Sequence, residues 1–406
     1  MTEPRTPNPE LDMEAALALL DEQGLRRHLS TADEAGPTRL VLDGKAYLNF
    51  ASNDYLGLAQ HPELREAAKA AIDRFGVGSG ASRLVTGSHR LHAELEAKIA
   101  GWKRVPRALA FSSGYAAALG TIPALAGPRD LVILDKLAHA CLLDGARLSG
   151  AGMRVFPHQN LGRLEALLKS NANAGDGRRV LIVTESVFSM DGDRADLKAL
   201  VDLKDRYGAW LLVDEAHAVG LIGSAGEGLI SLLGLQDRVE LQMGTLSKAL
   251  GVSGGYLAGS ATLIDYLVNR ARSFIYSTAP PPALAAAALA AIRLVEAAEG
   301  ARLRRRLWAN VNQLCAALEN WAPPEPASAI VPVKLGSEKD ALAASSALRH
   351  AGIWIPAIRY PTVARGTARL RVTVSAAHSP EMIAELGRVL PTILPSPGGA
   401  PSAVPA

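Results

Sequence analysis

The stretch that decides the fold contains Leu211-Leu212-Val213-Asp214-Glu215-Ala216-His217 and, further along, Gly244-Thr245-Leu246-Ser247-Lys248-Ala249-Leu250-Gly251. An apolar run ends in a carboxylate and an imidazole, and a second run ends in a lysine among small and hydroxylated residues. One interpretation is a buried strand followed by a surface lysine in a turn. Lys248 lacks the charged neighbours of a solvated lysine, which favours a lysine that forms an imine, with Asp214 tuning what the imine holds.

Short apolar runs alternate with helix-like segments around this stretch. The expected strands are residues 108–111, 131–134, 154–156, 180–183, 210–213, 241–243 and 256–258. Strands separated by crossover-sized segments predict an α/β fold with a mainly parallel sheet covered by helices on both faces. Polar residues such as Asp135, Glu185 and Thr245 follow these runs, at the strand ends where open α/β sheets bind ligands.

The sequence predicts four parts. Residues 1–52 are an N-terminal segment with a disordered start (1–12), a helix (13–29) and a hairpin at Asp43-Gly44. Residues 53–290 form the large domain, and residues 291–394 form a smaller α+β domain against which the N-terminal segment packs. Residues 395–406 are a disordered tail. A helix over 280–299 leads out of the large domain, and Arg304-Arg305-Arg306 in the next helix is expected on a solvated face.

Composition excludes several classes of function. The chain has 406 residues and a formal net charge of +3, which gives no support to a nucleic-acid partner. Cys141 and Cys315 lie far apart without CxxC spacing, which argues against a disulfide scaffold or a cysteine-ligated metal site and fits a reducing compartment. No signal-peptide pattern or long uninterrupted apolar run is visible, so we expect a cytoplasmic protein without a membrane partner.

A glycine-rich loop, Gly76-Val77-Gly78-Ser79-Gly80-Ala81, matches the G-x-G-x-x-A pattern of dinucleotide-binding sites. That fingerprint requires a preceding strand and an immediately following helix, whereas a helix over 62–75 is expected before this loop. The context therefore argues against a dinucleotide site, although an oxidoreductase remains a rival interpretation. No G-x-x-x-x-G-K-[ST] pattern occurs.

Several residues near the strand ends suit a planar, phosphorylated ligand. Ser113-Gly114-Tyr115 opens a helix-like segment, and a helix N-terminus binds anions readily, although a simple strand-to-helix turn is equally consistent. Asp214, if buried, needs a cationic partner, which a protonated pyridine nitrogen supplies. His217 could donate to a ring hydroxyl and His139 could stack on the ring, although a lone histidine is usually structural. The combination of Asp214, His217 and Lys248 is the strong signal.

The chain resembles the α-oxoamine synthases, which are pyridoxal-phosphate enzymes of the aspartate-aminotransferase fold (fold type I). The likeness runs from about residue 26 to 377, with its motifs in chain order. These motifs are Asn53-Asp54-Tyr55-Leu56-Gly57-Leu58, Gly78-Ser79-Gly80-Ala81-Ser82-Arg83, Ser113-Gly114-Tyr115, Thr184-Glu185-Ser186-Val187-Phe188-Ser189-Met190-Asp191-Gly192, Val213-Asp214-Glu215-Ala216-His217 and Thr245-Leu246-Ser247-Lys248.

The resemblance implies roles around the cofactor ring. Lys248 forms the imine with pyridoxal 5'-phosphate, and Asp214 holds the pyridine nitrogen. His217 contacts the ring hydroxyl, and His139 stacks above the ring. Glu185 and Ser189 lie near the ring.

The resemblance also implies phosphate and substrate contacts. The phosphate is bound by Ser113, Gly114, Tyr115 and Thr245, together with Ser277 or Thr278 from a second subunit, which implies a homodimer with a shared active site. Asn53 and Arg371 hold the carboxylate of the amino acid. Thr362 faces the substrate, and Arg26 lies near the acyl chain or coenzyme A.

The implied activity is condensation of an amino acid with an acyl thioester and loss of CO2. Residues 357–363 and 366–371 look most like the member of the family that joins L-alanine to pimeloyl-CoA, or to a pimeloyl-carrier protein, in biotin biosynthesis. Tyr360 and Arg365 replace frequent prolines of that pattern. Members that use glycine or serine with acetyl, succinyl or palmitoyl thioesters remain alternatives, as does a catalytically idle cofactor-binding domain.

Overall fold

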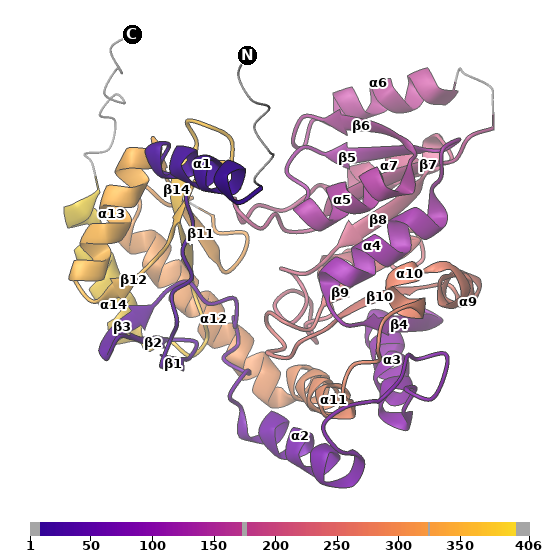
Figure 1. Ribbon diagram of the computed structural model, residues 1–406, viewed down its shortest axis with the longest axis horizontal. Helices are drawn as coiled ribbons and strands as arrows, with labels where there is room; N and C mark the ends of the chain where they lie inside the picture. Colours follow the sequence, from indigo (N-terminus) through magenta and orange to yellow (C-terminus); the bar gives the residue numbers. More distant parts are fainter. Residues whose placement is uncertain (1–8, 173–176, 324, 395–406) are drawn as a thin grey trace, which may run out of the picture.

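The computed structural model describes residues 9–172, 177–323 and 325–394 and contains one large sheet and two small ones (Figure 1). The large sheet has the order β4-β10-β9-β8-β7-β5-β6. Its strands are β4 (Arg107–Phe111), β5 (Leu131–Asp135), β6 (Gly152–Phe156), β7 (Val180–Glu185), β8 (Trp210–Asp214), β9 (Leu241–Thr245) and β10 (Gly255–Gly259). Only β10 runs antiparallel to its neighbours, β4 and β9. The prediction of an α/β fold with a mainly parallel sheet is therefore confirmed.

Helices cover both faces of the large sheet because its strands alternate their side chains between two cores. Leu211 and Val213 of β8 lie in one core, and Leu212 lies in the other. The second core contains residues of α4, α5 and α9, whereas the first contains residues of α3, α6, α7 and α11. These helices are α3 (Arg90–Lys103), α4 (Gly114–Leu125), α5 (Ala140–Ser149), α6 (Leu161–Ala172), α7 (Leu197–Arg206), α9 (Ala261–Arg270) and α11 (Pro282–Glu296), with α2 (Pro62–Phe75), α8 (Leu229–Leu232) and α10 (Arg272–Ile275) beside them.

The two small sheets lie on the other side of the molecule, beyond α11 and α12 (Figure 1). One has the order β1-β2-β3-β12 and the other the order β11-β14-β13. The parallel pairing of β3 with β12 joins the N-terminal hairpin to the C-terminal part of the chain. The elements are β1 (Glu34–Ala35), β2 (Arg39–Leu42), β3 (Lys45–Asn49), β11 (Ile330–Gly336), β12 (Ile353–Trp354), β13 (Ala357–Ile358), β14 (Ala368–Thr373), α12 (Ala298–Ala317), α13 (Glu338–His350) and α14 (Pro380–Ile393).

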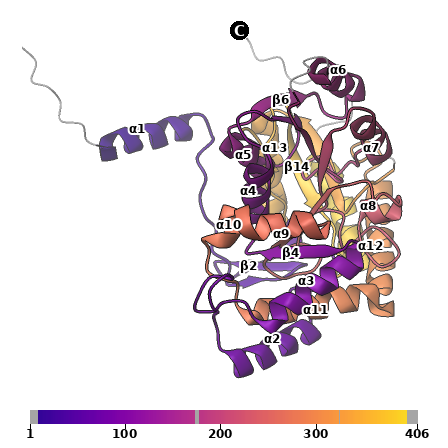
Figure 2. The same cartoon turned by 90° about the vertical axis from the view of Figure 1, so that its right-hand side faces the viewer.

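The N-terminal helix differs from its predicted position. Helix α1 spans Pro9–Glu22, so residues 9–12 are helical rather than disordered, and the helix ends well before residue 29. It ends there because Gly24 adopts a left-handed conformation with φ of 63°, which favours glycine and stops the helix. Figure 2 shows α1 projecting away from the rest of the molecule. The remaining residues expected to be disordered, 1–8 and 395–406, lie outside the described part of the chain.

Two predictions about the helices after residue 280 were wrong in detail. The first helix ends at Glu296, and α12 begins at Ala298 after one extended residue. Arg304 was expected on a solvated face but is only 6% exposed, because it lies on the same face of α12 as the buried Leu307. Its guanidinium donates to the carbonyl oxygens of Val295 at 2.8 Å and Ser224 at 2.6 Å. Among the described residues, no helix is long and apolar enough to cross a membrane.

Candidate active site

Polar side chains from neighbouring strands meet at one edge of the large sheet. In the register of the sheet, Glu185 at the end of β7 lies beside Asp214 at the end of β8, and Asp214 lies beside Met243 of β9. A cavity of about 180 Å³ lies over these strand ends. It is lined by Ser113, Gly114, Tyr115, His139, Cys141, Glu185, Asp214, Ala216, His217, Met243, Thr245, Ser247 and Lys248. The structure therefore brings together the predicted ring and phosphate residues of this chain, except Ser189, which does not line the cavity.

One end of this cavity is suited to an anion. Ser113 caps the N-terminus of α4, where its side chain accepts a hydrogen bond from Ala116 N at 3.0 Å. The first N–H groups of the helix, those of Gly114 and Tyr115, have no carbonyl within the helix to bind. Thr245 lies close to Gly114: a Cβ atom placed on Gly114 would be 3.6 Å from the Cβ atom of Thr245. The Thr245 hydroxyl is therefore near the N-terminus of α4. Backbone N–H groups, the helix dipole and hydroxyls together match a phosphate.

A buried carboxylate, that of Asp214, also lines the cavity. Asp214 is 5% exposed and accepts one hydrogen bond from Ala216 N at 2.9 Å. Burial raises the pKa of Asp214, and the nearby Lys248 partly opposes that rise. A buried carboxylate is costly unless a cation pairs with it, so this position suits the protonated nitrogen of a pyridine ring.

Lys248 and Glu185 are both pushed toward their neutral forms. Burial lowers the pKa of Lys248, which increases the fraction of free amine. Burial, and then the charge of Asp214, raises the pKa of Glu185 well above its ordinary value. One carboxyl oxygen of Glu185, Oε1, is buried without a hydrogen-bond partner. An orphaned polar atom of this kind is costly and indicates a partner that a bound molecule supplies.

His217 contacts a residue to which the sequence analysis assigned no role. Its Nδ1 lies 2.6 Å from the hydroxyl of Tyr55, which comes from the loop after β3. Burial and the charge of Lys248 lower the pKa of His217 well below its ordinary value, so the ring is neutral. The burial of Tyr55 in turn raises the pKa of its phenol, which stays protonated. Tyr55 lies within the quoted loop motif, but only the fold shows that it reaches His217.

A second unassigned residue, Cys141, lines the cavity beside His139. The Nδ1 atom of His139 lies 3.0 Å from the sulfur of Cys141, and His139 caps helix α5. Burial raises the pKa of the Cys141 thiol, so it is not a thiolate nucleophile. Cys141 is the second residue of α5, and its position two residues after His139 was the only signal in the sequence for its place at the cavity. Within the described residues, no group of His, Cys, Asp and Glu side chains could hold a metal ion.

Arg371 connects the small antiparallel sheet to this edge of the large one. It is 7% exposed, and its Nε donates to the carbonyl oxygen of Ser189 at 2.6 Å. Its Nη1 and Nη2 donate to Asn53 Oδ1 at 3.1 and 3.2 Å, and Nη2 lies 3.5 Å from the Tyr55 hydroxyl. No carboxylate of the described chain forms an ion pair with Arg371. A buried guanidinium without a paired anion is costly, so an anionic ligand would stabilise it. The arrangement is suited to the carboxylate of a small substrate.

Seven predicted residues do not line the cavity: Asn53, Ser189 and Arg371, which are joined to one another by hydrogen bonds of Arg371, and Arg26, Thr362, Ser277 and Thr278. Arg26 pairs with Asp21 at 2.5 Å and lies in a separate pocket of about 330 Å³ with other basic residues. Thr362 is exposed and lies 3.3 Å from the guanidinium of Arg27. The roles of Arg26 and Thr362 therefore stay predictions.

Ser277 and Thr278 lie in the segment before α11. Ser277 Oγ donates to the carbonyl oxygen of Thr278 at 3.2 Å, and Thr278 forms a bridge with Ser82. The glycine-rich loop that resembles a dinucleotide site thus contacts this segment, and it follows α2 instead of a strand. That Ser277 or Thr278 reaches the phosphate in a second subunit stays a prediction.

Comparisons with known proteins show the family of this chain. The family model described as aminotransferase class I and II matches residues 45–390. The 8-amino-7-oxononanoate synthase of Methylobacterium sp. (strain 4-46) is 50% identical over 390 residues, which cover 95% of this chain and 98% of that protein. The 8-amino-7-oxononanoate synthase of Citrifermentans bemidjiense is 47% identical over 378 residues, covering 92% and 96%.

Among solved structures, serine palmitoyltransferase from S. paucimobilis with a bound PLP-myriocin aldimine is similar, with a TM-score of 0.87 and 30% identity. The match covers 94% of this chain and 96% of that one. The 8-amino-7-oxononanoate synthase of Francisella tularensis has a TM-score of 0.70 and 28% identity, covering 85% and 97%. A lysine, a buried aspartate and a helix N-terminus around one cavity, on a fold shared with these proteins, place the chain in the aminotransferase class I and II family and, within it, among the α-oxoamine synthases.

Proposed function

We propose that this protein is an 8-amino-7-oxononanoate synthase of biotin biosynthesis. It condenses L-alanine with pimeloyl-CoA, or with a pimeloyl-carrier protein, and releases CO2 and the free thiol. The observation that carries the proposal is the single cavity in which Lys248, Asp214 and the N-terminus of α4 meet, with Arg371 beside it. Curated relatives of 44–50% identity over 95% of this chain support the choice of reaction within the family.

Pyridoxal 5'-phosphate is the cofactor, and the chemistry of the cavity fits it. Asp214 would hold the ring nitrogen, the N-terminus of α4 with Thr245 the phosphate, and Lys248 the aldehyde carbon. When bound, the cofactor withdraws electrons from the Cα atom of the amino acid and so makes its proton removable. The orphaned Oε1 of Glu185 would be a polar partner for the ring substituents.

The chain's own residues supply positioning and proton transfer. Lys248 lies where its ammonium is disfavoured, so its Nζ can accept the Cα proton of L-alanine as an amine and later return it. Arg371 binds the carboxylate of the amino acid and so orients the bond that is broken as CO2 leaves. His139, which caps the N-terminus of α5, lines the cavity and would stack on the cofactor ring.

The reaction needs no oxidant or reductant, and each bond that forms is matched by a bond that breaks. The Cα of alanine forms a bond to the thioester carbonyl carbon, the C–S bond breaks, and the thiol leaves with a proton. The carboxylate of the resulting β-keto acid then leaves as CO2, and Cα takes up a proton in its place. The products are 8-amino-7-oxononanoate, CO2 and the free thiol.

The quaternary structure and location belong to the same proposal. The protein is a homodimer with a shared active site, in which Ser277 or Thr278 of one chain completes the phosphate site of the other. It works in the cytoplasm on small-molecule substrates, without nucleic-acid or membrane partners. The division into residues 1–52, 53–290, 291–394 and 395–406 is the corresponding domain plan.

A thiol-release assay tests the substrate choice. Alanine, glycine and serine are each combined with pimeloyl, acetyl, succinyl and palmitoyl thioesters, the pimeloyl group being offered on coenzyme A and on a carrier protein. We expect alanine with a pimeloyl thioester to give the highest kcat/KM. The alternative is another α-oxoamine synthase, and the similarity to serine palmitoyltransferase favours serine with palmitoyl-CoA as its first candidate. A preference for that pair, or for glycine with acetyl-CoA, would refute the proposal.

A further inference from the structure

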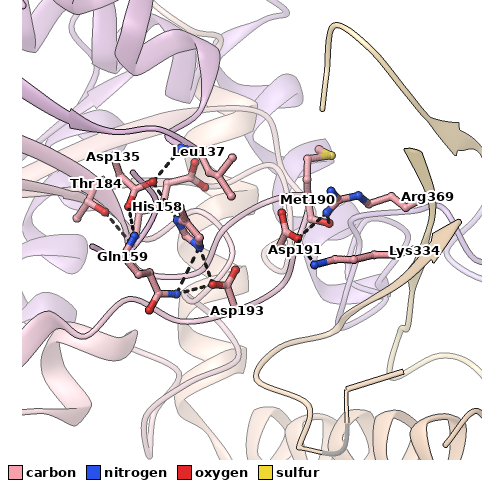
Figure 3. Close-up of polar contacts among 11 residues, drawn as sticks. Asp135, Leu137, His158, Gln159, Thr184, Met190, Asp191, Asp193, Lys334 and Arg369 are labelled. Atoms are coloured by element: carbon pink, nitrogen blue, oxygen red, sulfur yellow. Dashed lines mark hydrogen bonds and ion pairs between the residues drawn. The ribbon is translucent and has the colours of Figure 1, made fainter. Parts of the chain in front are cut away.

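His158 lies between two carboxylates from different parts of the chain (Figure 3). Its Nδ1 is 2.9 Å from Asp135 Oδ1, and its Nε2 is 2.8 Å from Asp193 Oδ2. Because both ring nitrogens face carboxylate oxygens, both must carry a hydrogen, and the ring is an imidazolium. The edge-on packing of His158 against Phe188, with ring centroids 4.3 Å apart, fixes the plane of the ring.

The charge of His158 is consistent with this geometry. Partial burial lowers the pKa of His158, but the hydrogen bonds to Asp135 and Asp193, and then their charges, raise it to about 9. These two carboxylates are the charged groups that face the ring. His158 therefore stays protonated at neutral pH.

Asp135 connects His158 to the loop that carries His139. Asp135 ends β5 and is 3% exposed. Its Oδ1 also accepts a hydrogen bond from Leu137 N at 2.8 Å, and its Oδ2 accepts one from Gln159 N at 3.0 Å. Leu137 lies two residues before His139, so the position of Asp135 sets the start of the loop over the cavity.

Asp193 connects His158 to the turn that carries Ser189. The carbonyl oxygen of Asp193 accepts a hydrogen bond from Phe188 N at 3.0 Å, and Gly192 N donates to the carbonyl oxygen of Phe188 at 2.8 Å. These bonds close residues 188–193 into a tight turn a short distance after Glu185. Gln159 donates to Asp193 from the same side as His158.

The other side of this turn is held by the small antiparallel sheet. Arg369 Nη1 lies 2.6 Å from Asp191 Oδ1, and Lys334 Nζ lies 3.2 Å from the same oxygen (Figure 3). Arg371 Nε donates to the carbonyl oxygen of Ser189 at 2.6 Å. The turn is thus fixed between His158, in the loop after β6, and the arginines of β14, one of which is the candidate carboxylate ligand.

We propose that His158, as an imidazolium between Asp135 and Asp193, is a positioning residue that holds the His139 loop and the Ser189 turn in place around the cofactor cavity. The proposal rests on the proposed function, because it assigns His158 to the same site. His158 itself does not line the cavity and takes no part in proton transfer.

The test compares His158→Gln with the wild type and with His350→Gln. Glutamine is neutral and cannot donate to both carboxylates, whereas His350 lies exposed on α13 with its Nδ1 2.8 Å from the carbonyl oxygen of Ser346 in the same helix. We expect His158→Gln to lower kcat about 10–100-fold, since small displacements of positioned groups have effects of this size. The KM for the thioester should change little. The visible absorbance and circular dichroism of bound pyridoxal phosphate should change, and His350→Gln should match the wild type.

Two further measurements do not depend on the reaction. In the cofactor-free protein, NMR of the imidazole nitrogens should show His158 protonated at pH 7.5, and Asp193→Asn should lower the pH at which it titrates. We also expect His158→Gln to weaken the binding of pyridoxal phosphate, and His158→Arg, which keeps the positive charge between the two carboxylates, to recover part of that affinity.

The results separate the possible failures. A wild type without condensation activity on any substrate pair would refute the proposed function, whereas the NMR and cofactor titrations would still decide the role of His158. A His158 that titrates near pH 6.5, or a His158→Gln protein with wild-type kcat and cofactor spectrum, would overturn the inference. If His158→Gln does not fold, Asp193→Asn and His158→Arg give the same comparison.

Discussion

Arg371 donates two N–H groups to a single oxygen of Asn53, at 3.1 Å from Nη1 and 3.2 Å from Nη2, and so joins strand β14 to the loop after β3. Within the described chain, every hydrogen-bond acceptor of this buried guanidinium is neutral: Asn53, the Ser189 carbonyl, and the hydroxyls of Thr373 and Tyr55. A fixed cation without an anion is pre-organised for an anionic ligand, because the protein has already oriented its donors.

The first prediction follows from this contact. Arg371→Lys should raise the KM for L-alanine about 10–100-fold, because a charge-assisted bidentate contact contributes roughly 1.5–3 kcal/mol. Asn53→Ala should raise it less, since the guanidinium keeps its charge. Steady-state kinetics at saturating thioester measure both. Arg349→Lys, at an exposed arginine that packs over Trp354, is the control and should leave the KM unchanged. An unchanged KM in Arg371→Lys would remove Arg371 from the substrate site.

Tyr55→Phe tests the link between Tyr55 and His217. The substitution removes the hydroxyl 2.6 Å from Nδ1 of His217 and leaves the buried ring in place. Loss of one hydrogen bond of roughly 0.5–1.5 kcal/mol should lower kcat about three- to tenfold and shift the absorbance of the bound cofactor. Tyr207→Phe removes a hydroxyl that contacts Glu165 away from the cavity and should do neither.

The pKa of Lys248 gives a prediction for the cofactor-free protein. Burial lowers its pKa below the unfolded value, which is about 10.4. The folded protein therefore binds the proton of Lys248 less tightly than the unfolded chain does. At neutral pH this difference lowers the free energy of unfolding. This destabilisation is fully present at pH values below the pKa of Lys248 in the folded protein. It disappears as the pH rises from that pKa to the pKa of Lys248 in the unfolded chain. Lys248→Met should raise the melting temperature of the cofactor-free protein at pH 7 and not above pH 10.5. A lower melting temperature at pH 7 would contradict the assignment.

The parallel sheet and the cavity were predictable because local patterns specify them. The continuous apolar run of β8 is that of a strand buried on both faces, and its polar end follows from the position of ligand sites in such sheets. The burial of Arg304 was not predictable, because its acceptors on Val295 and Ser224 belong to segments that only the fold brings near. The contact of Tyr55 with His217 was unpredictable for the same reason, because only the fold brings these two distant residues together.

Helix α1 shows a different limit. The amphipathic pattern indicated a helix, but the exposed Leu11 and Met13 show that its apolar side chains do not pack on this chain. The position of its end depends on Gly24, whose left-handed conformation a pattern of apolar residues does not reveal.

The last prediction concerns Glu215, the acidic neighbour of Asp214. Glu215 is fully buried and pairs with the equally buried Lys103, and its second oxygen accepts a hydrogen bond from Ile230 N at 3.0 Å. Lys103→Met should leave a buried carboxylate unpaired and lower the free energy of unfolding by roughly 3–5 kcal/mol. The double variant Lys103→Met/Glu215→Leu should recover much of this loss, because it removes both charges. Lys69→Met, which breaks the exposed pair with Glu66, should change the free energy of unfolding far less, because solvent screens an exposed pair. Denaturant midpoints of the three variants decide the question: a Lys103→Met midpoint equal to that of Lys69→Met would show that Glu215 is not held by this pair.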